Sequence, residues 1–346
     1  MRVRLQDIAD DLNLSKMTIS KVLRGQADIS DATKARVLKR VKELNYIPNI
    51  SASSLRTGQT RTLGLILPSI GKPFFGEVAA GITHAVGAAG YGLIVSSSQE
   101  DADAEQRQIE VFLSLQVDAL LIVTLQETSA FFNQVGRLKE TPVIFLNGRP
   151  AGAKGSYAGI NEEEVGRIAC EHLIQCGCKR IAYIRGSHSA AGDMRYKGYL
   201  EALARHRLTA HADLVAESMN ADESEFVRGY TAMERLLARR GRPDGVMTYT
   251  DMLAAGAMEA AGGARVRVPE DIRFVGCGND AAICGMRIPL TSMDVGGREL
   301  GQRAGKLALR VIHEGGRSTY RALVKPRLVR RRSSEGSRPG RAMERE

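Results

Sequence analysis

Small polar and basic side chains gather within a short stretch near the start of this 346-residue chain. Residues 15 to 21 read S-K-M-T-I-S-K, and on a helix Lys16, Met17, Thr18, Ser20 and Lys21 would face outward. Hydroxyls and lysines suit phosphate oxygens, and the first residues of such a helix can reach base edges. The chemistry indicated is DNA binding; the alternative is an ordinary helical hairpin with a solvated outer face.

Three short helices are predicted to position these side chains. Leu5, Ile8, Ala9 and Leu12 recur at helical spacing, and the turn at residues 13 to 15 ends that helix before Ser15 caps a second one. Residues 30 to 44 predict a third helix, which begins with a cap at S-D-A-T. Its apolar stripe consists of Val37, Leu38, Val41 and Leu44. Two helices on a tight turn with a third completing the core indicate a helix-turn-helix.

A second group of polar residues follows strands farther along the chain. From Thr62 to about residue 277, β-branched and leucine-rich strands alternate with helices in two successive series, which predicts an α/β fold of two doubly wound parallel-sheet lobes. Ligands of such sheets bind beyond the carboxyl ends of the strands, so the cleft between the lobes is the expected small-molecule site. The candidates at these strand ends, together with an arginine that opens a later helix, are Ser69, Phe74, Asn147, Gly186 to His188, Arg195, Thr250, Asp251 and Gly278 to Asp280.

The net charge of +10 is unevenly distributed. Residues 1 to 60 hold eleven Lys/Arg and six Asp/Glu, residues 324 to 346 hold eight and three, and the middle is neutral. A neutral body with a basic head fits a protein that touches a polyanion. The basic C-terminal residues are expected to form a disordered tail, which could add non-specific attraction to DNA.

Several classes of protein are disfavoured. The chain has no apolar run near the roughly 20 residues of a membrane span and no secretory h-region at its start, so a cytoplasmic, nucleoid-associated location is expected. The C-x-C at Cys176 and Cys178 lacks the further ligands of a metal site, so reduced cysteines and no cofactor are expected. The common nucleotide-binding, esterase and metalloprotease motifs are missing, which disfavours an enzyme. A periplasmic sugar-binding protein would share the lobes but should carry a signal peptide and lack residues 1 to 58.

The chain resembles the lactose/galactose-repressor family of transcription regulators. The matching stretches are L-Q-D-I-A, S-K-M-T-I-S-K-V-L, L-N-Y-I-P-N, A-S-S-L-R-T-G and T-L-G-L-I-L-P, and the likeness extends to about residue 329. The resemblance implies a homodimer on pseudo-palindromic operator DNA, with residues 49 to 56 forming a hinge helix whose Leu55 wedges into a base step beside Ala52. The DNA-contacting residues then expected are Leu5, Ser15, Lys16, Met17, Thr18, Ser20, Lys21, Arg24, Tyr46, Asn49, Ala52, Leu55 and Arg56.

The resemblance also implies a carbohydrate-type effector that controls repression of carbohydrate-metabolism genes. Its expected contacts are Ser69, Phe74, Asn147, Arg195, Thr250, Asp251 and Asn279. Asn147 stands where the family commonly has aspartate, and Thr250 where it has asparagine. With fewer carboxylates near Arg195, a sugar acid or sugar phosphate is favoured, and a neutral polyol held by the same hydrogen bonds is the alternative.

Four segments follow from this reading. Residues 1–46 are the helix-turn-helix head, 47–60 a hinge helix and linker, 61–329 the two-lobed effector-binding and dimerisation part, and 330–346 the disordered basic tail. The helix from Gly297 to His313 should return to the first lobe after residues 289 to 293, so that a double crossing forms a hinge between the lobes. Val78, Ile82 and Val86 are candidates for the dimer face, although an ordinary core stripe explains them equally well.

Overall fold

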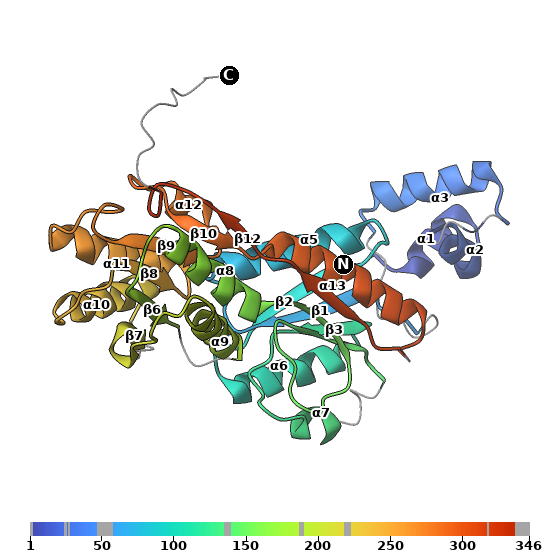
Figure 1. Cartoon of the computed structure of the whole chain (residues 1–346). Coiled ribbons are helices and arrows are strands. Elements are labelled where there is room, and N and C mark those ends of the chain that lie inside the picture. Colours follow the sequence, from blue (N-terminus) through green and yellow to red (C-terminus); the bar gives the residue numbers. More distant parts are fainter. Residues whose placement is uncertain are drawn as a thin grey trace. The chain divides into compact units, whose positions relative to one another are not determined.

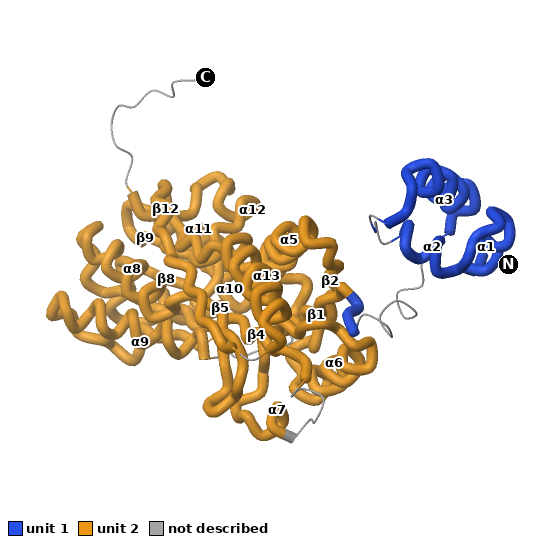
Figure 2. Tube along the Cα trace, turned by 90° about the vertical axis from the view of Figure 1, so that its right-hand side faces the viewer, with its two compact units in different colours: residues 1–60 blue, residues 61–346 orange. Residues whose placement is uncertain are grey.

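The computed structural model of the chain describes residues 3–23, 26, 28–46, 58–134, 140–186, 190–217, 223–316 and 318–335. The chain divides into two compact units, residues 1–60 and residues 61–346 (Figure 2). The predicted hinge helix lies almost wholly outside the described residues.

The described part of the first unit contains three helices, α1 (Leu5–Leu12), α2 (Lys16–Leu23) and α3 (Asp31–Glu43) (Figure 1). Their core consists of the buried side chains Ile8, Ala9, Ile19, Val22 and Val37. Asn13 ends α1 in the left-handed conformation with φ of 53°, which turns the chain into α2. The periodicity therefore predicted these helices correctly, except that Leu38 is 52% exposed and does not join the core.

The second unit contains two sheets of six strands. The first sheet has the order β11-β5-β4-β3-β1-β2, and all its neighbours are parallel. The second has the order β12-β10-β9-β8-β6-β7, in which only the β10–β12 pair is antiparallel.

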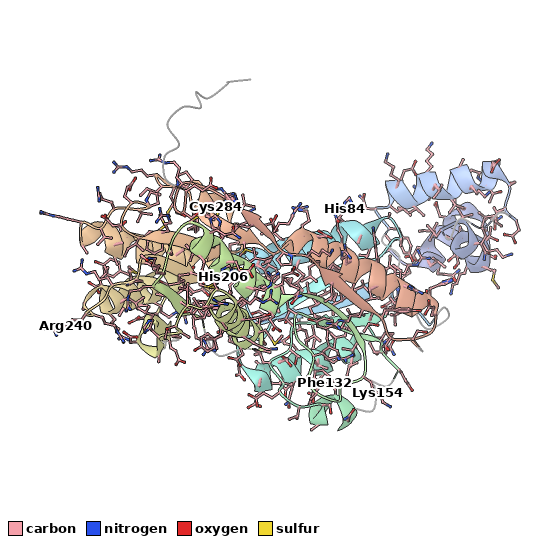
Figure 3. The ribbon with its side chains drawn as sticks, in the orientation of Figure 1. His84, Phe132, Lys154, His206, Arg240 and Cys284 are labelled. Atoms are coloured by element: carbon pink, nitrogen blue, oxygen red, sulfur yellow. The ribbon has the colours of Figure 1, made fainter. Side chains whose placement is uncertain are left out.

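The first lobe is built from β1 (Thr62–Leu67), α5 (Pro73–Gly87), β2 (Gly92–Ser97), α6 (Ala102–Ser114), β3 (Ala119–Ile122), α7 (Ala130–Gln134), β4 (Val143–Leu146), β5 (Ser156–Ile160), α13 (Gly297–His313) and β11 (Arg321–Val324). Helices α5 and α13 cover one face of its sheet, and α6 covers the other (Figure 1). Phe132 of α7 is labelled in Figure 3. It packs edge-on against Phe145 of β4 on that second face, with ring centroids 5.1 Å apart.

The second lobe is built from α8 (Glu162–Gln175), β6 (Ile181–Arg185), α9 (Ala190–Arg205), a 3-10 turn (Ala212–Leu214), β7 (Val215–Glu217), α10 (Glu225–Leu237), β8 (Gly245–Thr248), α11 (Asp251–Gly263), β9 (Arg273–Cys277), α12 (Ala281–Cys284), β10 (Thr291–Asp294) and β12 (Arg327–Val329). Helices α8 and α9 lie on one face of its sheet, and α10 and α11 on the other. The core between α5, α13, α8 and α9 is continuous through both lobes.

The chain passes between the lobes three times, after β5, after β10 and after β11. The predicted double crossing is therefore incomplete, because β11 joins the first sheet and β12 then returns to the second. Helix α13 packs on α5, as predicted. Val78, Ile82 and Val86 of α5 are at most 1% exposed, so they form a core stripe and not a dimer face.

Three helix pairs cross with a glycine of each helix at the contact. These pairs are Gly81 with Gly301 (α5 and α13), Gly166 with Gly198 (α8 and α9), and Gly229 with Gly256 (α10 and α11). A Cβ atom at any of these six positions would lie 1.9–2.2 Å from a backbone oxygen of the partner helix. Backbones that approach this closely hold the first residues of each helix in fixed relation to those of its partner.

The disordered tail was predicted to begin at residue 330, but residues 330–335 are ordered in the structure. Ser333 and Ser334 are 0% and 1% exposed. The Ser333 hydroxyl donates to the Phe274 carbonyl at 2.7 Å, and the Ser334 hydroxyl lies 2.7 Å from Thr291 Oγ1. Residues 330–335 therefore form a C-terminal strap packed on the second lobe, because polar side chains there satisfy buried backbone groups of β9 and β10.

Candidate functional site

The start of α2 carries the exposed side chains of the head. Ser15 caps this helix as predicted, its hydroxyl accepting from the Thr18 N–H at 3.0 Å. Ser15, Lys16 and Met17 are exposed, and Met17 is 61% exposed despite its apolar side chain. A large apolar side chain kept in solvent beside a lysine and two hydroxyls suits contact with thymine methyls and phosphates.

The remaining predicted DNA contacts differ in exposure. Thr18, Ser20 and Lys21 are half-buried, and Lys21 forms an ion pair with Asp28. Leu5 and Tyr46 are half-buried and pack against the core of the head, so they also stabilise it. The other predicted contacts, Arg24, Asn49, Ala52, Leu55 and Arg56, lie outside the described residues.

A buried ion pair marks the junction of the two lobes. Arg195 of α9 donates from Nε to Glu162 Oε2 at 2.5 Å and from a terminal nitrogen to the Tyr249 carbonyl at 2.7 Å. The two side chains are 8% and 5% exposed, and the guanidinium lies 4.5 Å from the centre of the Tyr249 ring. Asn147, which follows β4 of the first lobe, donates to the other oxygen of Glu162 at 3.5 Å. Glu162 therefore connects a first-lobe residue with the second lobe.

Glu162 was not among the effector contacts predicted from the sequence. It is the first residue of α8, two positions after the end of β5, a strand that was not predicted from the sequence. The expectation that fewer carboxylates near Arg195 leave its charge less neutralised is therefore wrong. The glycine contact explains this pairing. A Cβ atom at Gly166 would lie 1.9 Å from the Arg195 carbonyl oxygen, so only a glycine at this position lets α8 and α9 approach closely enough for the ion pair.

Asp251 and Asn279 are joined inside the second lobe. Asp251 accepts from the Ser292 hydroxyl at 2.6 Å and from the Asp280 N–H at 2.8 Å. The Asn279 N–H donates to the same Ser292 hydroxyl, and Arg331 of the C-terminal strap donates to Asn279 Oδ1 at 2.7 Å. Burial raises the pKa of Asp251 above its usual value, while the bonds from Ser292 and Asp280 oppose that shift. These contacts show that both residues hold the ends of β8, β9 and β10 together.

The Thr250 side chain is linked to the first lobe through Glu225. Its hydroxyl caps α11 and donates to Glu225 Oε2 at 2.7 Å. Glu225 in turn lies 3.6 Å from Lys72 Nζ of the first lobe.

Ser69 and Phe74 were also predicted to contact the effector. The Ser69 hydroxyl accepts from the Gly71 N–H, and the Phe74 ring packs edge-on against Phe75. Among the described residues, Ser69 and Phe74 form no side-chain hydrogen bond with the polar residues of the second lobe.

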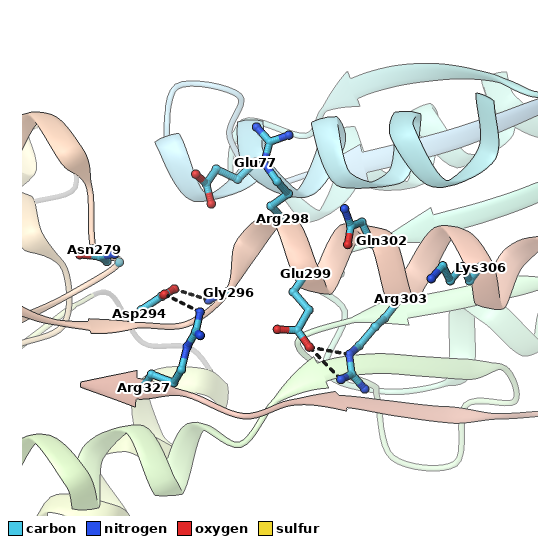
Figure 4. A pocket seen from close by; sticks show the side chains of 11 residues that line it. Glu77, Asn279, Asp294, Gly296, Arg298, Glu299, Gln302, Arg303, Lys306 and Arg327 are labelled. Atoms are coloured by element: carbon cyan, nitrogen blue, oxygen red, sulfur yellow. Dashed lines mark hydrogen bonds and ion pairs between the residues drawn. The ribbon is translucent and has the colours of Figure 1, made fainter. Parts of the chain in front are cut away.

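A pocket of about 800 Å³ lies beside the start of α13 (Figure 4). Of the predicted effector contacts, only Asn279 lines it, together with residues of both lobes. Two of its arginines are already paired, Arg303 with Glu299 at 2.7 Å and Arg327 with Asp294 at 3.1 Å. The predicted contacts are therefore divided between the buried lobe junction and the edge of this pocket.

The described residues offer no metal-ligand cluster of three or more His, Cys, Asp or Glu side chains. Burial raises the pKa of Cys277 and of Cys178 to about 12, so both are protonated thiols at neutral pH. All five cysteines are free, including Cys284 on α12 (Figure 3). Within the described part of the chain, no helix is both long and apolar enough to span a bilayer.

Two family models match the chain. Residues 4–49 match the model described as bacterial regulatory proteins, lacI family, and residues 170–334 match a periplasmic binding protein-like domain. The regulator NtdR of the NTD biosynthesis operon from Bacillus subtilis (strain 168) is 30% identical over 327 residues, covering 93% of this chain and 96% of that protein. The transcriptional repressor PurR from Histophilus somni (strain 2336) is 27% identical, covering 95% and 98%.

Solved structures agree in fold over both units' elements. The lac repressor dimer bound to operator and the anti-inducer ONPF has a TM-score of 0.85 at 24% identity, covering 96% of this chain and 99% of that one. The complex of the regulator CelR with cellobiose has a TM-score of 0.71 at 25% identity, covering 96% and 100%. With a helix-turn-helix head followed by two parallel-sheet lobes, and a relative of 30% identity along nearly its whole length, the chain belongs to the LacI family and is a DNA-binding transcriptional repressor, not an enzyme.

Proposed function

We propose that the protein binds a pseudo-palindromic operator as a homodimer and that a small carbohydrate-type effector at the lobe junction changes its affinity for that operator. The observation that carries this proposal is the network of Asn147, Glu162 and Arg195, which joins side chains of both lobes. A ligand that bonds to both lobes stabilises one arrangement of them over another, and this difference is what couples an effector to DNA binding.

The chemistry of the junction favours a neutral hydroxylated effector. Arg195 is already neutralised by Glu162, so the argument for a sugar acid or sugar phosphate loses its premise. Asn147 Oδ1 is buried and has no hydrogen-bond partner among the described residues. A buried acceptor without a partner costs about 1–3 kcal/mol, and a ligand hydroxyl that donates to it removes that cost. The cellobiose bound by CelR, a regulator of similar fold, is such a neutral sugar.

A homodimer is supported by surface features of the second unit. The edge strand β2 leaves Ile94 and Val95 about 40% exposed, and an unpaired apolar edge is suited to a partner. Two heads on two half-sites also require two chains. We further propose that Leu55 wedges into the operator as the hinge hypothesis states, that the regulated genes serve carbohydrate metabolism, and that the protein acts in the cytoplasm on the nucleoid.

Fluorescence anisotropy against a pool of palindromic duplexes tests the DNA part. Binding should be tight for a subset of sequences, weaken steeply as salt rises, and weaken again in Leu55→Ala. Replacing Met17 by Ala should alter which duplexes bind, while a substitution of an exposed residue of α3, Lys39→Gln, should not. If no duplex binds better than random DNA, the proposal of operator recognition fails.

The effector part is tested on the selected duplex. Neutral sugars, sugar acids and sugar phosphates are added separately, and a neutral sugar should change the anisotropy. Asn147→Ala should weaken that response while leaving DNA affinity without sugar intact. Tight binding of sugar acids together with no response to any neutral sugar would contradict the assignment.

A further inference from the structure

A second polar cluster spans the two lobes around Glu225. This residue begins α10 of the second lobe, and Lys72 precedes α5 of the first. The Glu225 carboxylate lies 3.6 Å from Lys72 Nζ and 3.6 Å from a terminal nitrogen of Arg228, and it accepts from the Thr250 hydroxyl at 2.7 Å. Glu225 is 17% exposed and Arg228 is 11% exposed, so the carboxylate is largely removed from water.

The groups around this carboxylate would suit an anion. Two cations and a hydroxyl converge on it, and the buried Nε of Arg228 has no hydrogen-bond partner among the described residues. Glu100 also approaches Lys72, at 2.8 Å, but its side chain is 47% exposed and screened by water. Without Glu225, the cluster would present Lys72 and Arg228 with a single exposed acid to balance them.

We propose that Glu225 occupies an anion site at the lobe junction and thereby excludes acidic effectors, so that it determines selectivity for neutral ligands. The Thr250 hydroxyl already donates to Glu225 and accepts from the Leu253 N–H, so an incoming anion would have to displace the carboxylate. A phosphate or carboxylate arriving beside Glu225 would also meet like charge at a few ångströms in a site poorly reached by water, which disfavours its binding strongly. This inference deepens the proposed effector function and rests on it for its biological meaning.

Titration calorimetry of the full-length protein with inorganic phosphate tests the inference without knowledge of the effector. Wild-type protein should bind phosphate weakly, and Glu225→Gln should bind it at least tenfold more tightly. The double variant Lys72→Met/Glu225→Gln should lose that gain. Glu201→Gln is the matched control, since it also removes a carboxylate from an arginine, Arg205, but on the partly exposed surface of α9, and it should show no gain.

The outcomes separate this inference from the proposed function. If Glu225→Gln binds phosphate no better than wild type, or if the double variant retains the gain, Glu225 does not fill an anion site. Glu225→Ser serves as a second variant should the first fail to fold, as judged by circular dichroism. If phosphate binding behaves as expected while no sugar of any kind alters operator binding, the proposed effector function fails and the anion site stands.

Discussion

Gly256 and Gly262 lie in the same helix, α11, yet replacing each by alanine should change stability in opposite directions. A Cβ atom at Gly256 would lie 1.9 Å from the carbonyl oxygen of Phe226 on α10, whereas a Cβ atom at Gly262 would meet nothing within 4 Å. Real Cβ atoms essentially never approach another heavy atom more closely than 3.0 Å. An alanine at position 256 therefore has to push the backbones of α10 and α11 apart by more than 1 Å.

The magnitudes follow from the two environments. Overpacking of a well-fitted interior costs about 1–3 kcal/mol, and at position 256 the obstructing atoms are backbone, which places the cost toward the upper end. At position 262 only the helix preference of alanine over glycine remains, a gain of up to about 1 kcal/mol. The two variants should thus differ by roughly 2–4 kcal/mol in the free energy of unfolding.

Thermal unfolding followed by circular dichroism measures the difference. Each kcal/mol shifts Tm by about 2–4 °C in chains of roughly 150–250 residues, so Gly256→Ala should melt several degrees below Gly262→Ala, with wild type between them. Gly256→Ala should also separate α10 from α11 and so weaken the contact between Thr250 and Glu225. If both variants melt above wild type, the two helices do not cross as closely as described, and the reasoning is refuted.

Three further predictions concern buried polar groups. Glu162→Ala should destabilise the protein by about 3 kcal/mol in urea unfolding because it leaves Arg195 buried without its partner, whereas the double variant with Arg195→Met should lose less. Burial lowers the pKa of His172, so the folded state binds fewer protons than the unfolded state between that lowered pKa and the usual value of about 6.5. The Tm should therefore fall as pH drops through this window, and it should fall less in His172→Gln. Removing residues 331–346 should lower the free energy of unfolding in urea by at least about 3 kcal/mol, at about 1 kcal/mol for each hydrogen bond of the C-terminal strap.

The helices of the head could be predicted because their determinants are local. The spacing of Leu5, Ile8, Ala9 and Leu12 identifies one apolar face, and Ser15 marks the next start by a bond to a residue only three positions away. Leu38 shows the limit of this reasoning. It satisfies the helical period of α3 but is exposed, because the small core of three short helices is already filled by Val37 and its neighbours.

The lobes could likewise be predicted from the alternation of apolar strands and helices, but strands β5, β11 and β12 could not. Strands β5, β11 and β12 are short and carry exposed or half-buried positions, so they lack the continuous apolar run that identifies a central strand. The crossings between the lobes depend on these strands, and the sequence reading accordingly missed one of the three.

The sequence by itself determined the class of the protein, its helix-turn-helix head and the strand ends from which effector contacts could come. Only the tertiary structure decided which polar side chains bond to one another. Glu162 and Arg195 are 33 residues apart, Thr250 and Glu225 are 25 apart, and Asn279 and Arg331 are 52 apart. Parallel strands bring such distant residues to one edge of a sheet, and glycine contacts between helices then set which side chains touch. That pairing neutralises Arg195, for which the sequence had indicated fewer neighbouring carboxylates, and it supports the neutral effector that we propose.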